Sequence, residues 1–418
     1  MSGYGIGAGG LLGFAYEQLP APVATSATPT AGGALTAGVY KYYITAINAL
    51  GETTISNELT GTTAAGNLTI TLVWAAVAGA TGYKIYRTAA AGATGTELLL
   101  TTLGVVTTFN DAAVGAPAGA LPTVNSAGTP GVYAPPVKYI PFTGESIKFV
   151  QNTQWRRPIR QSADVIGAVS GDANVEGDIT IEALEDCIAW FLGITRVTTV
   201  LSGTTPNFTY TATPSANAIP PKTASLTFVR AGEVFGYVGC VVNVTKFSID
   251  NGMLMYTVTI IGRDEASQAV PVASWPTSVP FGAGTYSVEF PSGSPVFDTD
   301  SIELDIDDGG SAQFRMKNTG RGAQFIQYGE RQVQLKASRD FLSRVDYDAF
   351  KAYTAQSVTI TAARGANNSV SLIVNTAIKD TYEVNLSAQG DLVRGDIAYQ
   401  GVGAPAYNLI VKTQEVVI

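Results

Sequence analysis

The 418-residue chain contains no histidine. Histidine is the most frequent general base and metal ligand near neutral pH, so its absence excludes a Ser–His–Asp triad and the common zinc sites. The glycine-rich residues 7–10 follow no strand that could begin a phosphate-binding strand–helix turn. We therefore expect a protein that is not an enzyme and that uses no cofactor and no metal.

Cysteine is nearly absent as well, since Cys187 and Cys240 are the only two. Two cysteines make no disulfide framework, and we expect both to be buried thiols, although one disulfide between them stays open. No apolar run approaches the roughly 18 residues of a membrane span. Residues 1–13 are rich in glycine and lack the basic start of a signal peptide. These absences predict a soluble protein, made in a cytoplasm and without a membrane anchor.

Charged residues are sparse, with 25 Lys and Arg against 33 Asp and Glu and a net charge of −8. This balance argues against a protein that binds nucleic acid through a basic patch. The apolar content of 46% argues against disorder. The chain length predicts two or three domains, and the abundance of glycine, alanine, threonine and valine is typical of β-structure with many turns.

Residues 137–193 carry the clearest structural pattern in the sequence, because an alternating strand there leads into a helix. Residues 175–182 (VEGDITIE) alternate, which predicts a strand with one buried and one solvent-facing side. The spacing then becomes helical and predicts an amphipathic helix of about three turns that ends at Gly193. Its apolar stripe consists of Leu184, Cys187, Ile188, Phe191 and Leu192.

The C-terminal part repeats this order of elements. Residues 332–337 alternate and lead into a predicted helix over residues 339–353. Predicted strands at 358–362 and 370–376 follow the helix. The next segment, residues 382–399, repeats the hairpin predicted at 245–261 in the first half. The apolar stripe of this second helix consists of Leu342, Val345, Ala349 and Tyr353. We infer a duplicated domain.

Residues 19–128 have a different character, with short alternating strands, frequent turns and no helical spacing. This pattern predicts a β-sandwich. Trp74 and the strand at residues 83–87 resemble immunoglobulin-like and fibronectin type III modules, although the order of segments differs from theirs. Trp74 and Tyr83 are expected in the core of this sandwich rather than on a ligand-binding surface.

Residues 131–146 (GVYAPPVKYIPFTGES), with the loop, acidic strand and helix that follow, resemble the tail tube proteins of bacteriophages with long non-contractile tails. The resemblance implies a mainly β fold with two tail-tube-type β-barrel or sandwich domains, each with one packed helix. We place an N-terminal arm at 1–18, the inserted sandwich at 19–128, and the tube-type domains at 129–277 and 278–418. Loop tips tolerate such insertions.

The resemblance also implies a function: a structural subunit that stacks as rings around the channel for genome ejection. Six such domains usually complete a ring in this family, so two per chain imply trimeric rings with pseudo-sixfold symmetry. The implied location is the virion tail, assembled in the host cytoplasm. The implied partners are other copies of the chain and the tape measure, tail terminator and distal tail proteins, while DNA passes without specific binding.

Two apolar or basic segments are candidates for contacts between subunits or rings. The arm is apolar enough to need a partner surface, and in tail tube proteins the loop over residues 143–172 contacts the neighbouring ring. Both segments are expected to become ordered on stacking. The candidate interface residues are Leu11, Leu12, Phe14, Trp155, Arg156, Arg157 and Arg160.

Acidic side chains occupy one side of two predicted strands. They are Glu176, Asp178 and Glu182 in the first half and Glu303, Asp305 and Asp307 in the second. A calcium site would need carboxylates that converge, whereas alternating acids point the same way along a strand. Both rows are candidates for lining a channel that repels DNA, and a simple solvated face stays open.

Two other classes of protein are open alternatives. A surface adhesin or receptor-binding virion protein would use the sandwich to bind host glycans and would form no tubes. A carbohydrate-active enzyme would place Glu303 or Asp305 in a closed cleft, although no aromatic groove accompanies these acids.

Overall fold

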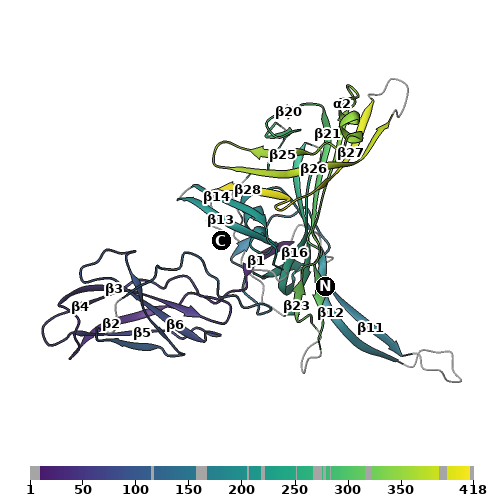
Figure 1. Ribbon diagram of the computed structural model, residues 1–418. Helices are drawn as coiled ribbons and strands as arrows, with labels where there is room; N and C mark the ends of the chain where they lie inside the picture. The colour runs from purple at the N-terminus through teal and green to yellow at the C-terminus, as the bar shows by residue number, and fades with distance from the viewer. Residues whose placement is uncertain are drawn as a thin grey trace. The chain divides into compact units, whose positions relative to one another are not determined.

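The computed structural model describes residues 10–113, 117–156, 167–204, 207–217, 222–250, 252–266, 275, 279–282, 284–315, 322–385 and 393–414. The fold is mainly β, as predicted, with two short helices among the described residues (Figure 1). The chain divides into two compact units. The main unit comprises residues 1–16 and 131–418, and the small unit comprises residues 17–130.

Two sheets build the small unit. One has the order β2 (Ala24–Thr30), β5 (Thr69–Trp74), β8 (Thr108–Asp111), and the other has the order β4 (Leu59–Thr63), β3 (Gly38–Ile47), β6 (Gly82–Arg87), β7 (Leu98–Leu103). Side chains from both sheets form one apolar core. Trp74 and Tyr83 lie in it with their ring centroids 5.4 Å apart, which confirms the prediction that they are core residues.

The two ends of the small unit lie side by side. The Leu19 amide donates to the Ala127 carbonyl at 2.8 Å, and the Thr129 amide donates to the Glu17 carbonyl at 2.8 Å. Gln18 and Gly128 form a β-bridge between these bonds. The chain therefore enters and leaves this unit at one place.

In the main unit, the segments before and after the small unit pair with each other. Strand β1 (Leu11–Tyr16) pairs with β9 (Lys138–Tyr139) and with β15 (Ala224–Arg230). The Ile140 amide also donates to the Leu12 carbonyl at 2.9 Å. Segments before and after the small unit thus belong to one sheet.

A central sheet runs through the main unit. Its order is β11 (Lys148–Arg156), β12 (Gly167–Glu182), β17 (Met253–Gly262), β16 (Glu233–Asp250), β21 (Thr299–Asp307), β24 (Gln332–Asp340), β27 (Arg394–Gly401) and β26 (Ser369–Asn385). Every neighbouring pair is antiparallel. The short strand β10 (Gly144–Glu145) also pairs with β12.

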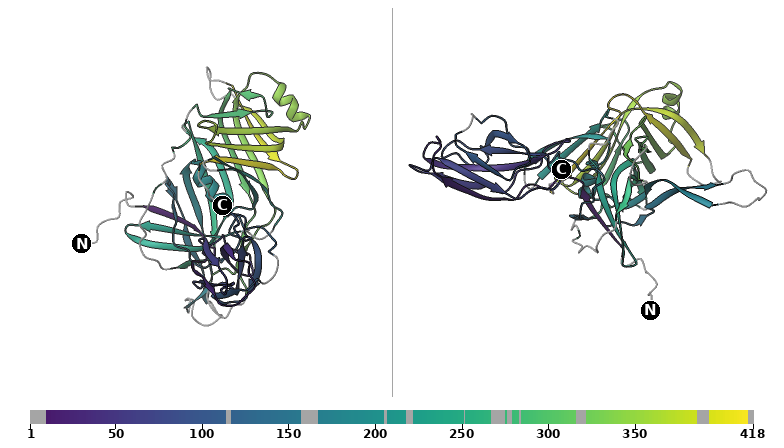
Figure 2. Two further views of the ribbon diagram at one scale, coloured as in Figure 1. Left: turned by 90° about the vertical axis from the view of Figure 1, so that its left-hand side faces the viewer. Right: turned by 90° about the horizontal axis from the view of Figure 1, so that it is seen from below.

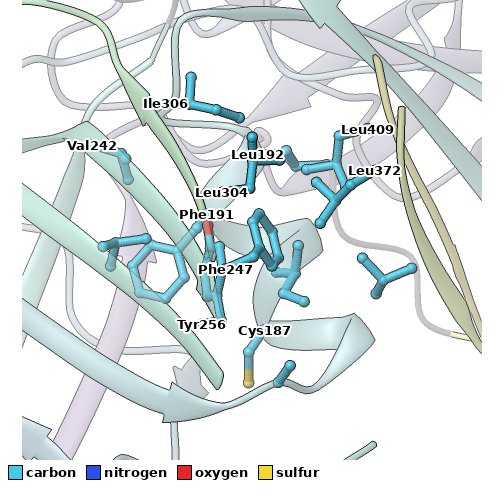
Figure 3. Close-up of a cluster of buried hydrophobic side chains, with 14 of the residues drawn as sticks. Cys187, Phe191, Leu192, Val242, Phe247, Tyr256, Leu304, Ile306, Leu372 and Leu409 are labelled. Atoms are coloured by element: carbon cyan, nitrogen blue, oxygen red, sulfur yellow. The ribbon is translucent and has the colours of Figure 1, made fainter. Parts of the chain in front are cut away.

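The remaining strands of the main unit pair with one another, with β16 or with β26, apart from one separate pair. They are β13 (Val197–Thr204), β14 (Asn207–Pro214), β18 (Asp264–Ala266), β19 (Tyr286–Glu289), β20 (Pro295–Val296), β25 (Gln356–Ala363) and β28 (Tyr407–Thr413), with a separate pair β22 (Ser311–Gln313) and β23 (Phe325–Gln327). One apolar core runs across both predicted halves, and Figure 3 shows Phe247, Tyr256, Leu304 and Leu409 meeting in it. The halves on either side of residue 277 share this core.

The same pairing order occurs twice in the main unit. In the first half, the long strand β16 pairs with β15, β17 and β18. In the second half, the long strand β26 pairs with β25, β27 and β28. The order β11–β12–β17–β16 in the central sheet likewise matches β21–β24–β27–β26, and β1 with β9 corresponds to β19 with β20.

Helix α1 (Glu185–Leu192) forms where the sequence predicts a helix. The prediction gave it one solvent-facing side, but all eight of its residues are buried. Its two acidic residues are buried because the second half of the chain binds them. Arg364 bonds to Glu185 at 2.5 Å, and the Thr413 hydroxyl donates to Asp186. Gly193 caps the helix as predicted, although in a right-handed conformation.

Gly193 is required for close packing, because a Cβ atom there would lie 2.3 Å from the Tyr16 hydroxyl. That hydroxyl donates to the Trp190 carbonyl at 2.6 Å and cannot move without losing the bond. We expect Gly193→Ala to lower the free energy of unfolding by about 1–3 kcal/mol, measured by denaturant titration. Gly282→Ala, whose Cβ would meet nothing within 4 Å, is the control and should change it by less than about 0.5 kcal/mol.

The second helix differs from its prediction. Arg339 and Asp340 extend β24, because they pair with β27, and helix α2 spans only Val345–Lys351. None of its residues is buried, and Figure 2 shows the helix on the outside of the strands. It is held by Tyr347 and Phe350, whose rings lie 5.8 and 6.3 Å from that of Tyr382. The expected packed apolar stripe is therefore wrong for this helix.

Candidate assembly surfaces

The two acidic rows lie on one side of the central sheet, which we call the polar face. The strand registers place Asp178 opposite Thr259, Thr259 opposite Val244, and Val244 opposite Asp307. Paired residues of neighbouring strands point to the same side of a sheet. The alternate residues Ile179, Ile181, Leu304 and Ile306 point into the core. The rows therefore share one face, with β17 and β16 between them.

Lysines are interleaved with these acids. Glu303 bonds to Lys246 at 2.5 Å and to Lys336 at 3.4 Å. Partial burial alone would raise the pKa of Glu303, but the two ammonium groups outweigh it and hold that pKa below its ordinary value. Burial, followed by the neighbouring Glu303 carboxylate, raises the pKa of Asp305.

The row on β12 is less neutralised. Glu176 lies 3.7 Å from Lys148, and both side chains are well exposed, so this pair contributes little. Asp178 accepts a hydrogen bond from the Thr259 hydroxyl at 2.6 Å. The sequence did not single out Lys148, Lys246 or Lys336, because only the strand register shows which lysines stand beside the acids.

The hairpin of β11 and β12 carries Trp155, whose side chain is 61% exposed. Residues 151–155 and 168–170 are all exposed, and no described residue in 149–155 or 167–171 is charged. Figure 1 shows the hairpin projecting from the main unit. The exposed part of the hairpin is therefore a two-stranded ribbon, an arrangement that has little stability of its own. Of the basic residues predicted beside Trp155, Arg157 and Arg160 lie outside the described residues, and only the backbone of Arg156 is described.

The arm residues occupy a different position. Leu12 and Phe14 are buried in the core of the main unit, and Leu11 is half-buried. Strand β1 pairs with β15 and stacks Phe14 against Phe191, with ring centroids 5.7 Å apart. These side chains are therefore occupied within the chain itself, which differs from the predicted interface role. Residues 1–9 lie outside the described part.

The central sheet has two edge strands, β11 and β26, along which part of the backbone pairs with one neighbour only. Among the described strands, β11 pairs only with β12. On the opposite side of the sheet, residues 379–385 of β26 pair only with β27. Open strand edges carry unpaired amide and carbonyl groups and are templates for pairing with another chain.

Neither a metal cluster nor a membrane-spanning helix is found among the described residues. In both cysteines the thiol is buried, and no disulfide joins them. A family model described as phage tail tube protein matches residues 125–405. A comparison with curated proteins finds no match.

Proposed function

The chain belongs to the phage tail tube protein family, and we propose that it forms trimeric rings that stack into the tube of a long, non-contractile tail. The family is structural, and membership makes the chain a component of the virion tail that assembles with itself and with other tail proteins. We further propose that these include the tape measure, tail terminator and distal tail proteins. The observation that carries the trimer is the repeated pairing order within the main unit.

Two repeats per chain support pseudo-sixfold rings. The repeats are joined inside the chain where β16 pairs with β21, in register from Val244↔Asp307 to Ser248↔Glu303. By the same order, β26 of one copy would pair with β11 of the next, since these are the edges on which pairing stops. A head-to-tail contact of this kind closes into a ring when the rotation between copies closes.

The polar face supports the channel. In a ring built this way the central sheets of all copies form one continuous wall, and the acids on its inner side would repel DNA rather than hold it. The candidates are the six acidic residues named above, with Lys246 and Lys336 reducing the charge around Glu303. The Trp155 hairpin is the proposed contact between successive rings.

Electron microscopy of the purified full-length chain at high concentration tests this function. Tubes or stacked rings with threefold symmetry and a sixfold-like inner wall are the expected result. True sixfold symmetry would contradict the assignment of two repeats per chain. Dispersed particles under every condition would instead favour an adhesin whose small unit binds a ligand, although no observation now supports that alternative.

The small unit is proposed to be an inserted immunoglobulin-like decoration. Its paired ends at Glu17 and Thr129 mean that joining Gln18 to Thr129 should leave β1 and β9 paired. We expect the shortened chain to fold and to form the same tubes, as judged by circular dichroism and microscopy. Loss of folding in this variant would show that residues 19–128 are part of the structural core.

A further inference from the structure

The two helices hold equivalent places in the two repeats but differ completely in burial. Helix α1 follows β12, and α2 follows β24, the strand with the same neighbours in the second repeat. Both helices have acidic residues in the first turn. Yet every residue of α1 is buried and none of α2 is.

Part of the cover of α1 comes from the following repeat. The turn after β25 supplies Arg364, which bonds to Glu185 at 2.5 Å. The end of β28 supplies Thr413, whose hydroxyl donates to Asp186. Both groups belong to the repeat that joins the first one through β21. Among the described residues, no third repeat follows the second one to cover α2 in the same way.

The uncovered surface around α2 includes three bulky apolar side chains beside the exposed charges of Arg344 and Asp348. Leu342 is 79% exposed, Val345 is 74% exposed and Tyr353 is 77% exposed. Tyr353 has a φ of 52°, a left-handed conformation that is costly for a residue with a side chain. Several bulky apolar side chains at this exposure within one short segment favour a surface that a partner covers.

We propose that α2 is covered in the ring by the first repeat of a second copy, at the turn that joins β15 to β16. The element equivalent to the turn after β25 is the turn after β15, at residues 230–233, because β15 and β16 pair as β25 and β26 do. This inference rests on the proposed function and adds the residues of the lateral contact. The internal joint between the repeats thus serves as the template for the joint between copies.

The turn after β15 is suited to such a contact. Ala231, Gly232 and Glu233 are exposed, and Arg230 at the start of the turn is fixed by side-chain contacts. Arg230 bonds to both carboxylate oxygens of Glu145, at 2.8 and 2.6 Å, and lies 4.9 Å from the centroid of Phe228. A preformed turn loses little conformational entropy when a helix packs on it.

Crosslinking between chains that each carry one added cysteine tests the contact. Cys187 and Cys240 are fully buried, so cysteines introduced by Glu233→Cys and Val345→Cys would be the reactive ones in the full-length protein. After the two variants are mixed and assembled, a short bismaleimide should link one to the other. Each variant alone should give little linked product. Efficient linkage of Val345→Cys to itself would show helix-to-helix contact and overturn the proposal.

Assembly of the wild-type chain distinguishes failure of the proposed contact at α2 from failure of the proposed tube function. Tubes that form without any crosslink in the mixture would overturn this contact and leave the tube function in place. Failure of the wild-type chain to form rings or tubes, again without a crosslink, would overturn both.

A charge substitution gives an independent measurement. Val345→Asp should raise the concentration needed for half-maximal assembly by about tenfold or more, since it places a carboxylate in a desolvated contact. Val105→Asp in the small unit, where Val105 is 70% exposed, is the matched control and should leave that concentration unchanged. Equal assembly by both variants would contradict the proposal.

Discussion

Replacing Arg364 with alanine should lower the free energy of unfolding of the full chain by about 3–5 kcal/mol at pH 7. The substitution leaves the Glu185 carboxylate, only 3% exposed, without its cationic partner. It also removes the guanidinium group that lies 4.9 Å from the centroid of the Phe281 ring. Denaturant titration at pH 7 measures the loss. A change below about 1 kcal/mol would show that the pair adds little to folding.

The pH dependence identifies the cause. Burial, which outweighs the bond to Arg364, raises the pKa of Glu185 above its ordinary value. A raised pKa favours the protonated folded state, so this contribution is fully present below the unfolded pKa, about 4.3, and is lost as the pH rises through the folded pKa. The deficit of Arg364→Ala should therefore shrink from pH 7 to pH 5. The double variant Glu185→Gln with Arg364→Met should lose less than Arg364→Ala, because no charge is left unpaired.

Reversing charge on the polar face should make assembled tubes retain DNA. Asp178→Lys with Glu182→Lys changes the net charge from −8 to −4, since each substitution adds two. If this face lines the channel, tubes assembled with short linear DNA should hold it in a form protected from nuclease, and retention should fall steeply with salt. Wild-type tubes should retain almost none. Co-sedimentation after nuclease treatment measures the difference.

The control has the same net charge but leaves the polar face intact. Glu265→Lys with Glu330→Lys reverses two exposed acids outside the named rows. Its tubes should hold no protected DNA. DNA that binds the face variant but is fully digested by nuclease would place the polar face on the outside of the tube, contrary to the proposal.

Local patterns in the sequence predict where strands and helices form better than they predict what covers each of these elements. Alternation in residues 175–182 predicts a strand whose apolar side is buried, and Ile179 and Ile181 are buried as expected. The spacing after it predicts α1, but the same kind of spacing after residue 337 predicts a packed helix, whereas the apolar residues of α2 are exposed. The difference lies in contacts between segments far apart in sequence, such as Arg364 with Glu185, which no local pattern records.

The candidate surfaces show the same limit. The acids of the polar face can be listed from the sequence, but the lysines that neutralise Glu303 come from β16 and β24, and only the register brings them together. Leu12 and Phe14 look like an exposed apolar arm because the strands that cover them begin more than a hundred residues later. The exposure of Trp155 agrees with the expectation drawn from the arginines that follow it, but the sequence predicts a loop there, and Trp155 lies instead on strand β11.

Because the two ends of the small unit lie side by side, the position between Tyr16 and Gly131 is suited to the insertion of a folded domain. Any domain whose own termini lie together could be exchanged there, because the strands that complete the main unit meet on either side of it. In the proposed tube, every copy would then carry the new domain, and the domains would repeat at regular intervals. Phages could change what their tails present by replacing one gene segment, and the same position offers a route to arrays of enzymes or binding proteins on a filament.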